Sequence, residues 1–265
     1  EPVAATLSST ATAVLGTRKH IRHNKGTWLF LPTHDAGRHR LQLVLHAFSE
    51  VRNPELRIGD KTVSFNGKLD QGETLTIGPG NIARVLPGNM LHRKDAVCGR
   101  GPGVKETISK NYVAWGSQKY LVEMGRKYEI AMTGRVADGA SDSLRVEYLG
   151  RNGNWNNLYS SITPLAGKFT KTTSTHRVTI RVPKVDGKSV FVRVLLYNQT
   201  NKGTIILQSA LLKKAGGERD VSGQLSGELP TPGSRPLLVK YTDQTRAFAA
   251  YWRLRVDLKF VEELR

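Results

Sequence analysis

The sequence predicts an all-β protein of two β-sandwich or jelly-roll modules, with a C-terminal segment docked onto them. Apolar residues recur with a period of two more often than with helical spacing, which is the pattern of half-buried strands. Gly, Pro, Asn and Asp interrupt these alternating runs at short intervals, as they do in sandwiches and barrels. No apolar run approaches the length of about twenty residues that a membrane-spanning helix needs, so we expect no membrane partner.

The first module is predicted at residues 27–90, after a basic N-terminal arm at residues 1–26. Its clearest strand is residues 40–48, where three alternate leucines share one face. The pairs Gly59-Asp60 and Asn66-Gly67 suit tight hairpins because Gly and Asn accept a positive φ. The strands expected in this module are residues 27–31, 40–48, 55–58, 61–65, 74–77 and 82–86.

A polar, glycine-rich linker at residues 91–110 precedes the second module, which is predicted at residues 111–214. A second linker, rich in Gly, Ser and Pro, is expected at residues 215–236. Residues 237–265 form the docked segment, because a short tail with an alternating strand at 253–260 cannot build a core of its own. The strands expected in the second module are residues 111–115, 127–136, 143–149, 155–162, 176–182, 189–197 and 204–212.

The chain carries 40 Lys and Arg against 22 Asp and Glu, a formal net charge of +18. Such a charge attracts polyanions, either nucleic acid or acidic polysaccharide. It is spread along the chain without a recognition helix, zinc finger or ribonucleoprotein motif, which argues against nucleic acid. The single cysteine, Cys98, excludes an intrachain disulfide and a cysteine-based zinc cluster.

Residues 120–214 resemble the jelly-roll, galactose-binding-like carbohydrate-binding modules of extracellular proteins. The stretches that carry the resemblance are residues 125–130, 155–164, 179–183, 190–197 and 203–212. In such modules the last strand usually carries acidic residues, where this chain has Gln208 and Ser209. The departure leaves a structural calcium ion of the family type unsupported, and we expect no cofactor.

Residues 53–87 look like the ancillary β-sandwiches that follow catalytic domains in polysaccharide-degrading enzymes. Together the two resemblances imply a non-catalytic, extracellular or periplasmic protein that binds a polysaccharide. The basic residues on its predicted strands favour an acidic one, carboxylated or sulfated. A catalytic domain of a larger enzyme is the partner that the two resemblances imply. A similar spacing of strands and turns occurs in phage tail and baseplate sandwiches. The alternative is therefore a structural protein of a virus or phage particle, with other virion subunits as partners.

The residues predicted to bind the ligand combine aromatic rings, amides and guanidinium groups. An aromatic ring offers area to a sugar's C–H face, while Asn and Arg bind its hydroxyl groups. Trp155 has a competing interpretation as a core residue of its hairpin. Arg181 and Arg193 lie in alternating strands and form one cationic strip for carboxylates or sulfates if their faces coincide. The predicted set is Trp155, Tyr159, Asn156, Arg145, Arg181, Arg193 and Tyr197.

Four histidines, His20, His23, His34 and His39, stand in a basic stretch. We interpret them as part of a solvated arm rather than a zinc site, because no third ligand stands at a diagnostic spacing. No acid pair stands in a catalytic context, so we predict no enzyme. A β-sandwich polysaccharide lyase or a glycoside hydrolase fragment remains an alternative, since residues 197–199 are similar to the last strand of some alginate lyases.

Overall fold

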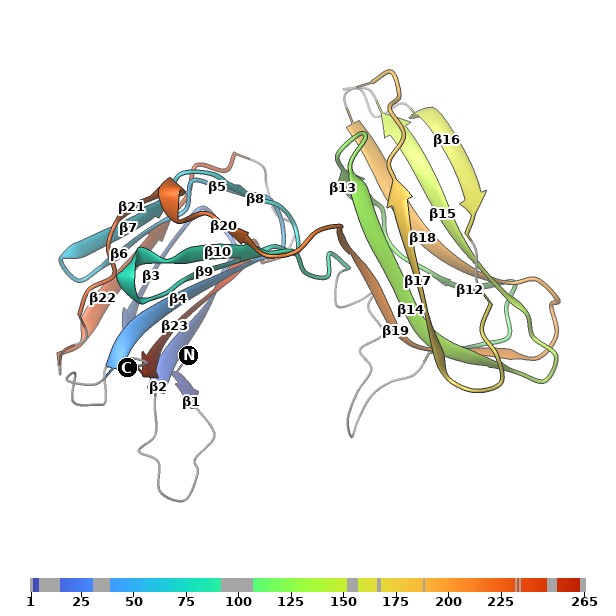
Figure 1. The fold of residues 1–265 in the computed structure, drawn as a ribbon, viewed down its shortest axis with the longest axis horizontal. Coiled ribbons are helices and arrows are strands. Elements are labelled where there is room, and N and C mark those ends of the chain that lie inside the picture. The colour runs from blue at the N-terminus through green and yellow to red at the C-terminus, as the bar shows by residue number, and fades with distance from the viewer. Residues whose placement is uncertain are drawn as a thin grey trace. The chain divides into compact units, whose positions relative to one another are not determined.

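The computed structural model describes residues 2–4, 15–30, 39–91, 107–151, 157–165, 168–187, 189–231, 233, 235–246 and 252–262. The chain forms two compact units: unit 1 combines Glu1–Gly88 with Gly217–Arg265, and unit 2 is Asn89–Gly216 (Figure 1). Apart from two 3-10 turns, Pro79–Asn81 (η1) and Ser222–Gln224 (η2), the regular structure of the described residues is β-strand, which confirms the all-β class. In this part of the chain no helix is long and apolar enough to cross a membrane.

Unit 1 contains two large antiparallel sheets and a small two-stranded one. The seven-stranded sheet runs, in spatial order, β1 (Pro2–Ala4), β2 (Leu15–Ile21), β23 (Leu254–Glu262), β4 (His39–Ala47), β9 (Thr74–Ile77), β10 (Ala83–Leu86) and β20 (Arg219–Asp220). The five-stranded sheet runs β21 (Leu225–Gly227), β7 (Lys61–Phe65), β6 (Glu55–Ile58), β22 (Leu237–Thr242) and β3 (Lys25–Phe30). A two-stranded ladder pairs β5 (Val51–Arg52) with β8 (Lys68–Leu69).

The C-terminal segment is part of both sheets of unit 1. Strand β22 pairs with β3 and β6, and β23 pairs with β2 and β4. Alternation explains the placement of β23, because Leu254, Val256 and Leu258 are fully buried while the residues between them face outward. The predicted docking of this segment is therefore confirmed, and it occurs inside the sheets rather than at their edges.

The division of unit 1 differs from the predicted one at two places. Residues 1–26 were expected to form an arm, but they contain β2, which pairs with β23. Residues 215–236 were expected to form a linker, but β20 pairs with β10 and β21 pairs with β7. The segments on both sides of unit 2 therefore contribute strands to the same sandwich.

Unit 2 is a sandwich of two antiparallel sheets. One sheet runs β11 (Thr107–Ser109), β19 (Thr204–Lys214), β14 (Lys127–Ala137) and β17 (Ser174–Arg181). The other runs β12 (Val113–Gly116), β18 (Ser189–Asn198), β15 (Asp142–Arg151) and β16 (Asn157–Pro164), and β13 (Tyr120–Val122) also pairs with β18.

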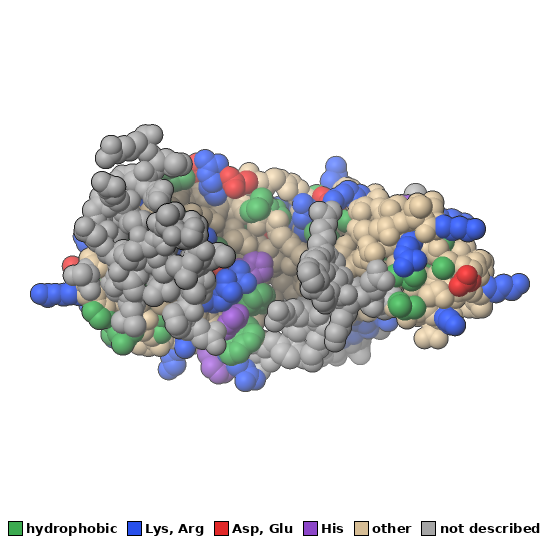
Figure 2. Space-filling view, turned by 90° about the horizontal axis from the view of Figure 1, so that it is seen from below, with side chains coloured by type: hydrophobic (Ala, Val, Ile, Leu, Met, Phe, Trp, Pro, Cys, Tyr) green, Lys and Arg blue, Asp and Glu red, His purple; other side chains and the backbone are tan. Residues whose placement is uncertain are grey.

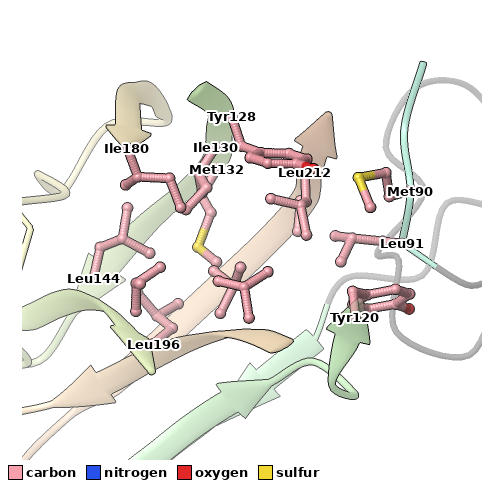
Figure 3. Close-up of a cluster of buried hydrophobic side chains, with 14 of the residues drawn as sticks. Met90, Leu91, Tyr120, Tyr128, Ile130, Met132, Leu144, Ile180, Leu196 and Leu212 are labelled. Atoms are coloured by element: carbon pink, nitrogen blue, oxygen red, sulfur yellow. The ribbon is translucent and has the colours of Figure 1, made fainter. Parts of the chain in front are cut away.

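The core of unit 2 is formed by the inward faces of its two sheets, with Ile130, Met132, Leu144, Leu196 and Leu212 among its side chains (Figure 3). Two residues from the border of the predicted linker, Met90 and Leu91, belong to the same core, as Figure 3 shows.

The entry and exit segments of unit 2 are tied together at Asn89. The Asn89 Oδ1 atom accepts a hydrogen bond from the Leu212 backbone N–H at 3.1 Å, and Asn89 Nδ2 donates to the Ala210 carbonyl at 3.1 Å. The Met90 N–H donates to the Leu212 carbonyl at 2.7 Å. The first residues of unit 2 are thus bonded to its last strand, β19.

Candidate functional site

Strands β15 and β18 place a set of polar and aromatic side chains on the outer face of their sheet. In β15 the buried residues Leu144 and Val146 point into the core, so Arg145 and Glu147 face outward. In β18 the same alternation turns Arg193 and Tyr197 outward. The register pairs Glu147 with Arg193, and it pairs Ser143, two residues before Arg145, with Tyr197. We call Arg145, Glu147, Arg193 and Tyr197, with the adjoining Tyr112, the β15–β18 face.

Arg145 and two tyrosines form one contact group on this face. The Arg145 guanidinium carbon lies 4.6 Å from the centroid of the Tyr197 ring, the geometry of a cation–π contact. The Tyr112 ring meets Tyr197 edge-on, with centroids 5.1 Å apart, and Tyr112 is 48% exposed. Arg145 is thus held against the Tyr197 ring, while the Tyr112 ring stays exposed to solvent.

Arg193 and Glu147 form a loose ion pair on the same face. Arg193 Nη1 lies 3.7 Å from Glu147 Oε2, which is too long for a hydrogen bond. Glu147 Oε2 and Arg193 Nε are both shielded from solvent, and neither has a hydrogen-bond partner in the structure. Shielded polar atoms are nearly always hydrogen-bonded in folded proteins, so these two atoms are exceptions, while the Arg193 side chain as a whole is 38% exposed.

Arg181 does not join the β15–β18 face. It lies on the exposed side of β17, in the other sheet of unit 2, and its Nη1 donates to the Gly125 carbonyl at 2.8 Å. Alternation within a strand predicts which way a side chain points, but it does not say to which sheet the strand belongs. The face of Arg181 therefore does not coincide with the face of Arg193.

The aromatic and amide residues of the predicted loop are not placed with these arginines. Trp155 and Asn156 lie outside the described residues. The backbone of Tyr159 lies in β16, where it pairs with Gly150, and its side chain lies outside what the structure describes. A sugar contact by these three residues stays a prediction.

Burial changes the pKa of one carboxyl group of this sheet, that of Asp142. Asp142, at the start of β15, is 1% exposed and accepts a hydrogen bond from the Phe169 N–H at 2.5 Å. Desolvation raises the pKa of Asp142 above its usual value of 3.8, although this hydrogen bond opposes the shift. The group fastens the segment around Phe169 to the sheet and takes no part in the outer face.

Two members of the face, Tyr112 and Glu147, were missing from the predicted site. Glu147 alternates with Arg145 along β15, so its place on the same face was available from the sequence. Tyr112 precedes β12 and reaches Tyr197 only through the pairing of β12 with β18. Within the described ranges, no group of three or more His, Cys, Asp or Glu residues is arranged to hold a metal ion.

No family model and no curated protein matches the chain. Among solved structures, the tandem CBM22-1–CBM22-2 domain of Paenibacillus barcinonensis Xyn10C covers 81% of this chain and 91% of its own, with 9% identity and a TM-score of 0.36. The CBM22-1 xylan-binding domain of the same protein covers 65% and 94%, with 15% identity and a TM-score of 0.28. A structure of infectious bursal disease virus, Gt strain, covers 99% and 74%, with 9% identity and a TM-score of 0.26. Carbohydrate-binding modules, the class of protein that residues 120–214 resemble, are thus among these solved structures.

Proposed function

We propose that the β15–β18 face of unit 2 binds an acidic polysaccharide without cleaving it. The observation that carries the proposal is the placement of Arg145, Arg193 and Tyr197 on one sheet face, with Arg145 4.6 Å from the Tyr197 ring. Guanidinium groups bind carboxylates and sulfates in a fork geometry, and aromatic rings offer area to a sugar's C–H face. The face therefore combines the two kinds of group that an acidic sugar requires.

Arg193 is the residue that we expect to bind the acidic group. Its side chain is 38% exposed, and its Nη1 lies 3.7 Å from Glu147 Oε2, which is too far for a hydrogen bond. A carboxylate or sulfate at this position would accept from Arg193 and replace the loose contact with Glu147. Arg145 is held in place by Tyr197, so little side-chain freedom is lost when it binds a second acidic group.

The exposed Tyr112 ring would contact the apolar face of the sugar. Glu147 is the carboxylate that the described part of this face provides, whereas hydrolysis of a glycoside by the common mechanism takes two. The proposed role is therefore that of a binding or ancillary part of an extracellular or periplasmic polysaccharide-processing system. The charge of +18 would draw such a polyanion to the protein.

Affinity electrophoresis tests this proposal with polygalacturonate, a sulfated polysaccharide and neutral xylan in the gel. We expect retardation by the acidic polymers that weakens steeply with salt, because the Debye length falls to about 8 Å at physiological ionic strength. Arg145→Ala and Arg193→Ala should each reduce retardation. Arg181→Ala, an exposed arginine on the opposite sheet, is the matched control. Equal retardation at low and high salt, or equal losses in all three variants, would contradict the proposal.

A structural role in a virus or phage particle is the second candidate. One observation favours it: Leu29 on β3 and Leu238 on β22 are direct cross-strand neighbours, and they are 57% and 43% exposed. An exposed apolar pair on a sheet suits contact with another subunit. Sedimentation velocity over a wide concentration range distinguishes the candidates, since a protein that stays monomeric and binds an acidic glycan is not an assembly subunit.

A further inference from the structure

The outer face of the seven-stranded sheet in unit 1 carries a row of four rings. The His20 ring lies 5.4 Å from the Trp252 ring and 6.4 Å from the Phe48 ring, and the Phe48 ring lies 5.0 Å from His46. Trp252 is 52% exposed, an unusual state for so large an apolar side chain. We call His20, His46, Phe48 and Trp252, together with Arg255, the unit 1 ring cluster.

Three neighbouring strands bring the ring cluster together. In the sheet β23 lies between β2 and β4, and its Arg255 is the register partner of both His20 and His46. Inward residues at adjacent positions, such as Leu45 and Val256, are buried in the core, so these three side chains share the outer face. Phe48 follows β4 and Trp252 precedes β23, which places both rings at the same end of these strands.

The cluster is flanked by cationic groups. Arg18 Nε lies 2.9 Å from one oxygen of Asp257, and Arg255 Nε lies 3.1 Å from the other. One carboxylate shared by two guanidinium groups leaves a net charge of +1 at these three residues. Both arginine side chains are partly exposed, at 41% and 31%. Figure 2 shows histidine, cationic and hydrophobic side chains gathered on the described surface of unit 1.

We propose that the unit 1 ring cluster is a second binding site for an acidic sugar residue. The exposed Trp252 ring is the stacking platform, and the partly exposed Arg255 binds the carboxylate or sulfate with donors that Asp257 does not occupy, since a guanidinium has five N–H groups. His46 Nδ1 is hydrogen-bonded to Thr74 Oγ1 at 2.7 Å, so its other ring nitrogen is the hydrogen-bonding group for a sugar hydroxyl. The inference rests on the proposed function for the ligand class alone, because it uses none of the residues of the β15–β18 face.

Titration calorimetry of the full chain with an oligogalacturonide and with a sulfated oligosaccharide tests the second site. Short oligosaccharides are used so that one molecule occupies one site and the stoichiometry can be counted. We expect two oligosaccharides per chain of one of these classes. Trp252→Ala should weaken one event by about five- to 150-fold, by analogy with the stacking of a nucleic-acid base on an aromatic ring, which contributes about 1–3 kcal/mol. Arg193→Ala should weaken the other event and leave this one unchanged.

Three further variants separate binding from folding. Trp252→Phe keeps a stacking ring and should retain most of the affinity, and Arg255→Gln should weaken the same event as Trp252→Ala. Leu29→Ala is the matched control, because Leu29 is an exposed apolar residue of unit 1 on the other sheet. If Trp252→Ala lowers the melting temperature, the affinities of the Trp252→Phe and Arg255→Gln variants decide whether the second site exists.

The outcomes for the two sites differ. A single event that Arg193→Ala abolishes and Trp252→Ala leaves intact overturns the second site only. A single event with the opposite response overturns the proposed function of the β15–β18 face and supports the second site. No binding of either oligosaccharide overturns both. If Trp252→Ala weakens the binding of a single-stranded oligonucleotide but not the binding of the oligosaccharides, the assignment of a sugar to the second site is wrong.

Discussion

Asp243 should be one of the most sensitive positions for the stability of unit 1. Its carboxylate is fully buried and accepts two hydrogen bonds, from the Tyr241 hydroxyl at 2.6 Å and from the Thr245 N–H at 2.8 Å. Arg253, whose side chain is 5% exposed, places its Nε 3.9 Å from Asp243 Oδ2. Burial, with the neighbouring carboxylate, raises the pKa of Tyr241 far above its usual value of 10.0, so its hydroxyl remains a donor at every accessible pH.

Replacing Asp243 with Ala removes the negative charge beside a buried guanidinium and leaves two buried donors without an acceptor. Breaking such a buried pair costs about 3–5 kcal/mol, whereas Tyr241→Phe, which removes one hydroxyl hydrogen bond, should cost about 1 kcal/mol. For a unit of this size each kcal/mol lowers the melting temperature by about 3 °C, so Asp243→Ala should melt about 10 °C lower. Asp243→Asn keeps an acceptor oxygen and should fall between the two. Thermal and urea unfolding measure the series, and a loss below about 1 kcal/mol for Asp243→Ala would refute the reasoning.

Burial and the nearby Arg255 lower the pKa of His46 below 6.5, so stability should decline as the pH falls below that value, and His46→Gln should remove part of the decline. The raised pKa of Asp142 acts in the opposite direction, because its contribution is present at acid pH and is lost as the pH rises through the folded pKa. Asp142→Asn, which keeps an oxygen acceptor, should therefore be more stable than the wild type above about pH 4, as urea unfolding at several pH values can measure. Deleting residues 237–265 removes inner strands of both sheets and should leave unit 1 unfolded by circular dichroism; a truncated chain that melts like the full one would contradict this. Trp155→Ala should cost about 1–3 kcal/mol of polysaccharide binding if its ring stacks on a sugar, or about 3–5 kcal/mol of stability if it fills a core.

The strongly alternating strands were the predictable part of the fold. In β4 the three leucines that alternation assigned to one face, Leu41, Leu43 and Leu45, are 2%, 0% and 1% exposed. The short strands β20 and β21 were not predicted, because a run of two or three residues is too short to show the alternation of buried and exposed side chains. Strand β2 was interpreted as a basic arm because its outward residues are charged. The carboxylate that pairs with Arg18 belongs to Asp257, in a strand far along the chain.

The candidate sites were predictable only in part, for a related reason. Alternation along β15 and β18 correctly turns Arg145 and Arg193 out of the core, but the shared face depends on which strands pair. Arg181 looked equivalent in sequence and lies on the other sheet. The unit 1 ring cluster joins His20 to Trp252 through a pairing of β2 with β23 that no local pattern reveals. His20 was therefore interpreted as part of a solvated arm.

The bonds at Asn89 have a consequence for how the chain reaches its folded state. Strands β2 and β23 are neighbours although all of unit 2 lies between them in sequence, so their pairing closes a very long loop. Closing such a loop is slow, because its entropy is lost before the contacts form. Unit 2 is continuous in sequence, so it can fold during synthesis before β22 and β23 emerge. Once it has folded, Asn89 and β19 lie side by side, and the two halves of unit 1 are joined as if by a short turn. Folding of unit 2 first therefore shortens the loop that the pairing of β2 with β23 has to close.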